Sequence, residues 1–386
     1  MFDFDTPVSR HHTDSLKWDL EDCRYPMWVA DMDFAAAPPI REALEAKLAT
    51  GVYGYQLLPR DFAPAVADWW RTRHGWAVDT SWVIFCTGVV PAVTTLVKCL
   101  TEEGDGVVCM TPVYDIFYHS VENMGRHVLE CPLLYNHGAY SIDWALLEER
   151  LADPTASLLI LCNPHNPTGQ VWSEKELTSI GNLCQKHGVT VVSDEIHCDI
   201  TIPSVDYFPY GRTPFGDKAV VCVSASKAFN LAGLQGAAVI VPDTALRERV
   251  ERALNAHEVA EPNVLAAVGT VAALRQGAAW LDELRAYLYD NRKALETYLA
   301  EALPEAYVVP QEATYLVWVD MSALLPDTSA LCAFLRREYA VWITAGAQYR
   351  GNGAMFVRVN VACPRALLIE GLRAFVEGTR RYLSRS

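Results

Sequence analysis

The chain has 386 residues, which is long enough for two or more domains with a large core. Its composition, 51% hydrophobic and 20% charged, is typical of a globular protein. The net charge of −15 argues against nucleic acids and anionic membrane surfaces as partners.

The amino-terminal region carries few periodic signals. It starts with an acidic stretch, residues 1–5, that lacks the apolar core of a signal peptide, and no apolar stretch of the chain approaches transmembrane length. The 11 cysteines include no C-x-x-C pair and no Cys/His cluster at zinc spacing. We therefore expect a cytoplasmic protein without a metal site or a membrane contact. We also expect residues 1–45 to pack with a small domain that lies farther along the chain.

Residues 46–285 are expected to form a large domain, because strand-like and helix-like patterns alternate through much of this region. Such alternation is typical of a mostly parallel sheet with helices on both faces. One of the helices is predicted at residues 174–187. The strands are predicted at residues 82–86, 106–110, 127–131, 157–161, 189–193, 219–223 and 237–241.

Residues 286–386 are expected to form a smaller α+β domain. A helical period rich in Ala and Leu covers residues 262–303. Beyond it, strands are predicted at residues 315–320 and 355–360, and helices at residues 329–339 and 365–382. The predicted fold class is therefore α/β, with a mostly parallel seven-stranded sheet in the large domain and a smaller α+β domain at the carboxyl end.

Polar motifs follow several of the predicted strands. Residues 87–91 (Thr-Gly-Val-Val-Pro) follow the first strand and open a helix, so the free N–H groups of Val89 and Val90 would suit a phosphate. Tyr114 follows the second strand, where its ring is placed to stack on a planar cofactor. A plain strand–helix turn and an ordinary core or surface aromatic are the structural alternatives.

A third motif, residues 163–169 (Asn-Pro-His-Asn-Pro-Thr-Gly), follows the strand at residues 157–161. Two Asn-Pro steps and a glycine force an irregular loop, within which Asn166 can donate to a phenolic oxygen. An Asn-Pro turn without a ligand is the alternative, but seven such residues are more specific than a turn requires.

The segment Ser-Asp-Glu-Ile-His at residues 193–197 closes another apolar strand. Asp194 is expected to be partly buried, and a buried charge needs a partner. A protonated pyridine ring is one such partner, and a structural Arg or Lys is another. His197 is expected to point into the same crevice, unless it is a core histidine with its own hydrogen bonds.

The segment Ser-Ala-Ser-Lys at residues 224–227 follows the next strand. Lys227 would lose solvation there, which lowers its pKa and frees the amine as a nucleophile and base. Ser224 and Ser226 can donate to a phosphate. A lysine that extends to the surface is the alternative. Arg358 interrupts an apolar strand, where it would pair with an internal carboxylate or with a substrate α-carboxylate.

These groups share one location, the carboxyl ends of strands in a single sheet or the adjoining domain, which is where open α/β sheets bind ligands. A carboxylate on one strand end and a lysine on another are what pyridoxal 5′-phosphate (PLP) chemistry requires. The lysine forms the Schiff base and the carboxylate keeps the pyridine nitrogen protonated. The sequence therefore predicts a PLP site.

With these motifs, the sequence resembles the fold-type I PLP enzymes of the aminotransferase superfamily. Within that superfamily it is similar to the MalY/PatB branch of cystathionine β-lyases and related C–S lyases. The resemblance covers nearly the whole chain. It is carried by the segments at residues 28–34 (Trp-Val-Ala-Asp-Met-Asp-Phe), 53–55 (Tyr-Gly-Tyr), 87–91, 163–169, 193–197, 224–227 and 358–360 (Arg-Val-Asn).

The resemblance implies roles for residues around the ring of the cofactor. Lys227 would hold PLP covalently and Asp194 would pair with the pyridine nitrogen. Asn166 and His197 would lie near the phenolic oxygen, and Tyr114 would stack on the ring.

It also implies roles for residues that bind the phosphate and the substrate. Val89, Val90, Ser224 and Ser226 would bind the phosphate. Tyr55 would reach the phosphate of the neighbouring subunit, which implies a homodimer with shared active sites. Arg358 would bind the substrate carboxylate, helped by the backbone near Ala30.

Two positions depart from many aspartate-aminotransferase-like enzymes. The residue three places after the pyridine aspartate is His197 rather than tyrosine, as in the MalY/PatB branch. The residue eight places after the lysine is Gln235 rather than an arginine that binds phosphate.

The implied activity is α,β-elimination from L-cystathionine, cysteine or related S-substituted cysteines, which gives a thiol, pyruvate and ammonia. Lys227 would take the Cα proton, and Lys227 or Tyr114 would protonate the leaving thiolate. Amino-acid metabolism, including methionine biosynthesis, is the implied setting. A class I/II aminotransferase would use the same residues and is the alternative. A MalY-like regulatory binding role is a further possibility, although no basic patch favours DNA binding.

Overall fold

The computed structural model describes residues 2–21, 23–136 and 138–385. Its larger part is built around a seven-stranded sheet with the order β2-β10-β9-β8-β7-β3-β4. β10 runs antiparallel to both neighbours, and the pairs from β9 to β4 are parallel. The strands are β2 (Val83–Cys86), β3 (Gly106–Thr111), β4 (His127–Pro132), β7 (Ala156–Cys162), β8 (Thr190–Asp194), β9 (Val220–Val223) and β10 (Ala237–Ile240). They are the predicted strands, and each end lies within one residue of its predicted position, which confirms the predicted fold class.

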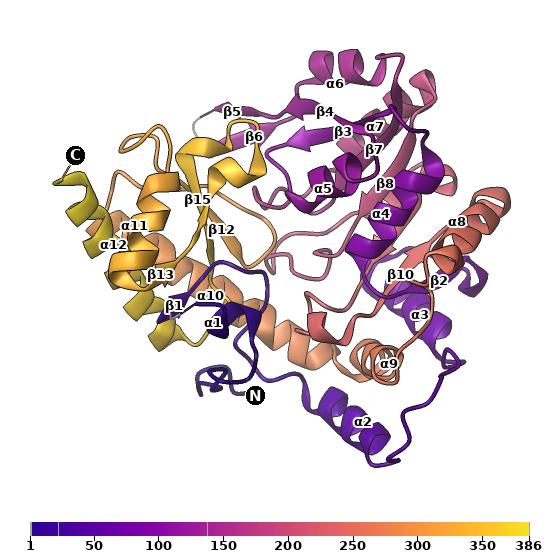
Figure 1. The fold of residues 1–386 in the computed structure, drawn as a ribbon, viewed down its shortest axis with the longest axis horizontal. Helices are drawn as coiled ribbons and strands as arrows, with labels where there is room; N and C mark the ends of the chain where they lie inside the picture. Colours follow the sequence, from indigo (N-terminus) through magenta and orange to yellow (C-terminus); the bar gives the residue numbers. More distant parts are fainter. Residues whose placement is uncertain (1, 22, 137, 386) are drawn as a thin grey trace.

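Helices cover both faces of this sheet (Figure 1). Alternate residues of β9 show why: Val220 and Cys222 pack in a core with α4, α5 and α8, whereas Val221 and Val223 face α3 and α9. The helix predicted at residues 174–187 is present as α7, which begins with a capping box at Ser173. The helices are α3 (Phe62–His74), α4 (Val89–Leu100), α5 (Ile116–Glu122), α6 (Trp144–Leu151), α7 (Glu174–His187), α8 (Thr244–Ala256) and α9 (Ala266–Gln276).

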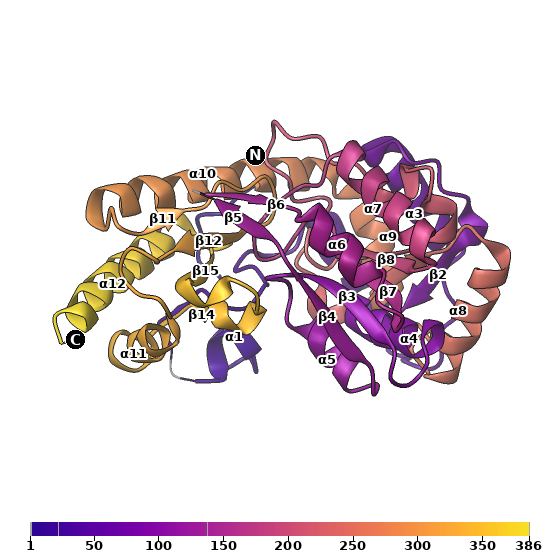
Figure 2. The ribbon, with the colours of Figure 1, turned by 90° about the horizontal axis from the view of Figure 1, so that it is seen from above.

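The carboxyl-terminal part has a four-stranded sheet with the order β11-β12-β15-β14, and all its pairs are antiparallel. Three helices pack beside it, and Figure 2 shows the long α10 running from this part toward α9. The strands and helices are α10 (Ala278–Ala302), β11 (Tyr307–Val308), β12 (Leu316–Asp320), α11 (Ser329–Tyr339), β13 (Val341–Trp342), β14 (Thr344–Ala345), β15 (Phe356–Asn360) and α12 (Arg365–Leu383).

The amino-terminal segment lies against both parts. β1 (Tyr25–Pro26) pairs in parallel with β13, whereas α2 (Pro38–Leu48) packs on α9. Sequence analysis did not identify α2. Its start is marked by the prolines of the Ala-Pro-Pro step, since proline is favoured in the first turn of a helix.

Short elements complete the fold. The hairpin of β5 (Leu134–Asn136) and β6 (Ala139–Ser141) follows β4, and α1 (Leu16–Asp19) precedes β1. Short 3₁₀ helices lie at Thr80–Trp82, Tyr210–Arg212, Gly216–Lys218, Ala232–Leu234, Gly346–Tyr349 and Gly353–Met355. Among the described helices, none combines the length and apolar character needed to span a membrane.

The two sheets meet at the carboxyl ends of the parallel strands. After β3, Val113 N–H donates to the Tyr349 carbonyl at 3.1 Å, and after β8, Thr314 N–H donates to the Ile200 carbonyl at 2.7 Å. The loops at this edge of the large sheet are therefore fixed against the carboxyl-terminal part.

Candidate active site

A cavity of about 260 Å³ lies at this edge of the large sheet. Residues that follow β2, β7, β8 and β9 line it, together with the amino-terminal segment. Most of the predicted site residues are among those that line it, namely Ala30, Val89, Val90, Tyr114, Asn166, Asp194, His197, Ser224, Ser226 and Lys227. Arg358 lies next to this group and Tyr55 does not, as described below.

Lys227 is half-buried in the wall of the cavity. Burial is the main cause that lowers the pKa of its amine from 10.5 to about 8. The Nζ atom donates a hydrogen bond to the Ala30 carbonyl at 2.8 Å. A lysine with such a pKa is partly neutral near physiological pH, which is the form that attacks a carbonyl.

Asp194, the last residue of β8, is buried with a relative exposure of 4%. Desolvation raises the pKa of its carboxyl from 3.8 to about 7, while the Ile196 N–H at 3.1 Å and the charge of Lys227 oppose the rise. Within the described part of the chain, no cationic side chain forms a salt bridge with it. A buried carboxylate in this condition is stabilised by a cationic group that enters the cavity.

Asn166 and Arg358 are joined directly. Arg358 Nη1 donates to Asn166 Oδ1 at 3.0 Å and Nη2 donates to the Trp28 carbonyl at 2.8 Å. Because Oδ1 of Asn166 accepts from the guanidinium, its amide nitrogen is left to donate into the cavity. Arg358 is buried, and its Nε atom has no hydrogen-bond partner among the described residues. Arg358 therefore has one buried donor, close to the cavity, that no described protein group binds.

The loop that carries Asn166 depends on close packing at its end. Gly169 has a φ of 68°, and a Cβ there would lie 2.6 Å from the side chain of Gln311. Gln311 also donates from Nε2 to the Pro167 carbonyl at 2.9 Å. Glycine is therefore required where the loop turns against the carboxyl-terminal part.

His197 also faces the cavity with an unpaired atom. Its Nδ1 is buried and has no hydrogen-bond partner within the described residues. Burial, and then the charges of Lys227 and Arg358, lower the pKa of the imidazole from 6.5 to about 3. The ring is therefore neutral at physiological pH.

The part of the cavity next to α4 can bind an anion. α4 begins at Val89, and no described side chain caps its first turn. The N–H groups of Val89 and Val90 therefore point outward from this turn. The Ser226 N–H donates to Ser224 Oγ at 3.0 Å, and Ser224 Oγ donates to the Gly236 carbonyl at 2.7 Å. The Ser224 hydroxyl proton is therefore donated to the Gly236 carbonyl, whereas the Ser226 hydroxyl takes no part in these two hydrogen bonds.

Two tyrosines of the predicted site differ in location. Tyr114 lines the cavity, and burial raises the pKa of its phenol far above neutral pH, so it keeps its proton. Tyr55 is fully exposed, in a stretch between α2 and α3 that has no regular structure, and does not line this cavity.

Sequence analysis missed the residues that hold the amino-terminal segment over the cavity. Tyr315 donates to the Ala30 carbonyl at 3.1 Å, the same oxygen that accepts from Lys227. Asn230 accepts from the Met32 N–H at 3.0 Å, and Asn360 Nδ2 donates to the Val29 carbonyl at 2.7 Å. Asn230 lies three residues after Lys227, which is its signal in the sequence, whereas Asn360 ends the Arg-Val-Asn segment and was given no role of its own.

The donor set fits PLP. An unpaired buried carboxylate would face the cationic ring nitrogen, a helix amino terminus with a free serine hydroxyl would bind the phosphate, and a desolvated lysine lies within the same walls. The amide of Asn166 and the neutral His197 would be the polar groups for the remaining ring oxygen.

The chain is similar to proteins of a known family. The family model described as aminotransferase class I and II matches residues 31–375. Cystathionine beta-lyase PatB of Bacillus subtilis (strain 168) is 41% identical, over 96% of this chain and 98% of that protein. Protein MalY of Escherichia coli (strain K12) is 38% identical, over 98% of this chain and 99% of that protein.

A similar fold is found in the crystal structure of cystalysin from Treponema denticola, which contains a PLP cofactor. It has a TM-score of 0.95 and 31% sequence identity, and the match covers 99% of this chain and all of that one. On the family match and these identities, the chain belongs to the aminotransferase class I and II family and, within it, to the group that includes PatB and MalY.

Proposed function

We propose that the protein is a PLP-dependent C–S β-lyase. It cleaves L-cystathionine, cysteine or related S-substituted cysteines to a thiol, pyruvate and ammonia. The observation that carries this proposal is the desolvated Lys227 in one cavity with the unpaired carboxylate of Asp194. Similarity to PatB, named a cystathionine beta-lyase, favours elimination over the other reactions of the family.

When bound, PLP supplies the electron sink that stabilises negative charge at the substrate Cα. Asp194 would keep the ring nitrogen protonated, and Asn166 and His197 would bind at the phenolic oxygen. The N–H groups of Val89 and Val90 would hold the phosphate. The hydroxyl of Ser226 adds a donor there, while Ser224 orients it through the Ser226 N–H.

Arg358 binds the substrate carboxylate through its unpaired Nε, next to the backbone of Ala30. Lys227, in its neutral form, takes the proton from the substrate Cα. The departing thiolate then receives a proton from Lys227 or from Tyr114, whose raised pKa keeps it protonated. Tyr114 also covers one face of the ring and helps to exclude water.

We further propose that the active unit is a homodimer. The stretch between α2 and α3 exposes Val52, Tyr53, Tyr55 and Leu57, with relative exposures from 60% to 108%. A contiguous apolar stretch of this kind is typical of an interface. In the dimer, Tyr55 would reach the phosphate in the neighbouring subunit and supplement a site that has Gln235 where many relatives have arginine.

A cytoplasmic location is also proposed. Apart from Cys23, the cysteines are free thiols in the structure, and most of them are buried. Unpaired cysteines in such number are typical of proteins in a reducing compartment. Cleavage of L-cystathionine there would supply homocysteine for methionine biosynthesis.

Thiol release tests the proposed function. The purified protein, loaded with PLP, is incubated with L-cystathionine, and the new thiol is measured over many turnovers. Lys227→Ala is expected to abolish the reaction. Lys218→Ala, which removes an exposed lysine just before β9, is the matched control and should keep it. Absence of thiol release from the wild type would refute the proposal.

A further inference from the structure

The turn that follows β8 presents side chains to two opposite sides. Asp194, Ile196 and His197 line the cavity, whereas Glu195 and Asp199 point to the opposite side. The turn is short and closed by its own backbone, because the Cys198 N–H donates to the Glu195 carbonyl at 3.1 Å. A displacement on the back of this turn must therefore move the residues on its front.

Glu195 is the first anchor on the back of the turn. It has a relative exposure of 0%, and its carboxylate accepts hydrogen bonds from Ser193 Oγ at 2.8 Å and from the Tyr210 N–H at 2.9 Å. The hydroxyl of Tyr207 donates to its other oxygen. Both oxygens of a fully buried carboxylate are thus bound by fixed donors.

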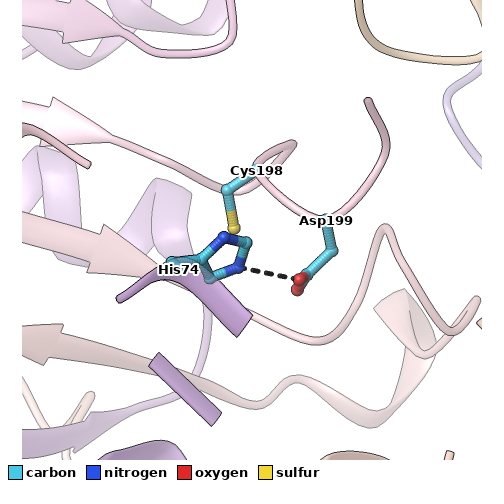
Figure 3. Close-up of side chains that lie close together, drawn as sticks. All are labelled: His74, Cys198 and Asp199. Atoms are coloured by element: carbon cyan, nitrogen blue, oxygen red, sulfur yellow. Dashed lines mark hydrogen bonds and ion pairs between the residues drawn. The ribbon is translucent and has the colours of Figure 1, made fainter. Parts of the chain in front are cut away.

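Asp199 is the second anchor, and Figure 3 shows it beside His74 and Cys198. His74 Nε2 lies 2.9 Å from Asp199 Oδ1. The indole N–H of Trp69 donates to both oxygens, at 3.0 and 3.2 Å. His74 and Trp69 both belong to α3, so this helix holds the end of the turn.

Tyr207 links the two anchors. Its ring packs edge-on against the ring of His74, with centroids 5.2 Å apart and planes at 82°. Its hydroxyl, which binds Glu195, also accepts from Asn163 Nδ2 at 3.3 Å. Asn163 begins the loop that carries Asn166, so Tyr207 contacts the supports of two separate cofactor-facing segments.

The cluster of His74, Cys198 and Asp199 consists of residue types that bind zinc. Here, however, Asp199 already accepts a hydrogen bond at both oxygens, and the guanidinium groups of Arg73 and Arg285 line the adjoining cavity. These positive charges oppose a metal cation. The chemistry of the cluster therefore favours a hydrogen-bonded anchor over a metal site.

We propose that Tyr207 and His74 are positioning residues for the cofactor: through Glu195 and Asp199 they fix where Asp194 and His197 lie in the cavity. This inference rests on the proposed function, since it assigns the front of the turn to PLP. It concerns residues on the far side of the turn from the cavity, which would act only through the turn and the neighbouring loop.

The test compares two tyrosine variants. Tyr207→Phe removes one hydroxyl from the back of the turn. Tyr140→Phe removes an equally buried hydroxyl, bound to the Trp318 N–H at 3.1 Å, from the hairpin of β5 and β6, and serves as the control. For each, we would measure urea unfolding of the cofactor-free protein, the dissociation constant for PLP, and the pH titration of the bound cofactor's absorbance.

The expected result is that Tyr207→Phe weakens PLP binding on the order of tenfold and shifts the pH midpoint of the cofactor absorbance. Tyr140→Phe should lower the urea midpoint to a similar extent and leave both cofactor readouts unchanged. His74→Gln, a second variant that keeps a donor of similar reach, should restore part of the affinity that His74→Ala loses.

Two outcomes separate the possible failures. If Tyr207→Phe and Tyr140→Phe give the same PLP affinity and absorbance titration as the wild type, the positioning role is refuted while the proposed function stands. If the wild type itself does not bind PLP, the proposed function is refuted. Should Tyr207→Phe fail to fold, the comparison of His74→Gln with His74→Ala decides the question.

Discussion

Replacing Arg358 by methionine isolates the recognition of the substrate carboxylate. The guanidinium is 5% exposed and its Nε has no partner among the described residues, so a carboxylate that binds there gains a charge-assisted hydrogen bond away from water. Methionine fills a similar volume and offers no donor. We therefore expect Arg358→Met to weaken the binding of amino acids and not of simple amines.

The magnitude follows from the bonds that are lost. A hydrogen bond to a charged group contributes about 1.5 to 3 kcal/mol, which corresponds to roughly a 10- to 100-fold weaker affinity. The variant also loses the bonds to Asn166 and Trp28, which together stabilise the fold by about 2 kcal/mol. The loss of these two bonds affects the binding of both ligands alike, so it cancels in the ratio of their affinities.

The assay measures the affinity of the PLP-loaded enzyme for L-alanine and for ethylamine, which lacks the carboxylate, from the change in cofactor absorbance. The ratio of the two affinities should fall roughly 10- to 100-fold in Arg358→Met. Arg350→Met, which removes a half-exposed arginine paired with Glu122, should keep the wild-type ratio. An unchanged ratio in Arg358→Met would falsify the assignment of Arg358 to the substrate carboxylate.

Three further predictions concern the lysine, its pKa and the dimer. Lys227→Ala should abolish turnover and the absorbance of covalently bound PLP, and its urea midpoint should change no more than that of Lys218→Ala. Retained absorbance would contradict the assignment of Lys227 as the residue that holds PLP. The rate at which cofactor-free protein takes up PLP should rise with pH and level off above about 8, because only the neutral amine attacks; a midpoint near 10.5 would mean that Lys227 is solvated. Leu57→Glu, at a side chain that is 93% exposed, should give a monomer in sedimentation velocity, and a stable dimer would place the interface elsewhere.

Much of the fold was predictable because the inner strands of the large sheet are buried on both faces. The resulting apolar runs, such as Val220–Val223, are bounded by polar residues that follow each strand. The same pattern located the candidate site, since Asp194 ends one strand and Lys227 follows the neighbouring strand by a few residues. Local sequence was sufficient for these features because each depends on a short segment.

Contacts between distant segments were not predictable. Asp199 and His74 are 125 residues apart, and Tyr315 and Ala30 are 285 apart. No pattern within one segment indicates such a partner. The location of Tyr55 is a related case: its full exposure follows from the path of the chain between α2 and α3, and its proposed role depends on a second subunit.

Elimination and transamination are distinguished by the amount of pyruvate that the PLP-loaded enzyme forms from L-cystathionine when no keto acid is added. The account predicts pyruvate in large molar excess over enzyme, formed together with an equal amount of thiol. If no pyruvate forms, and the cofactor is converted to the pyridoxamine form and restored by an added keto acid, the protein is an aminotransferase. That result would contradict the account.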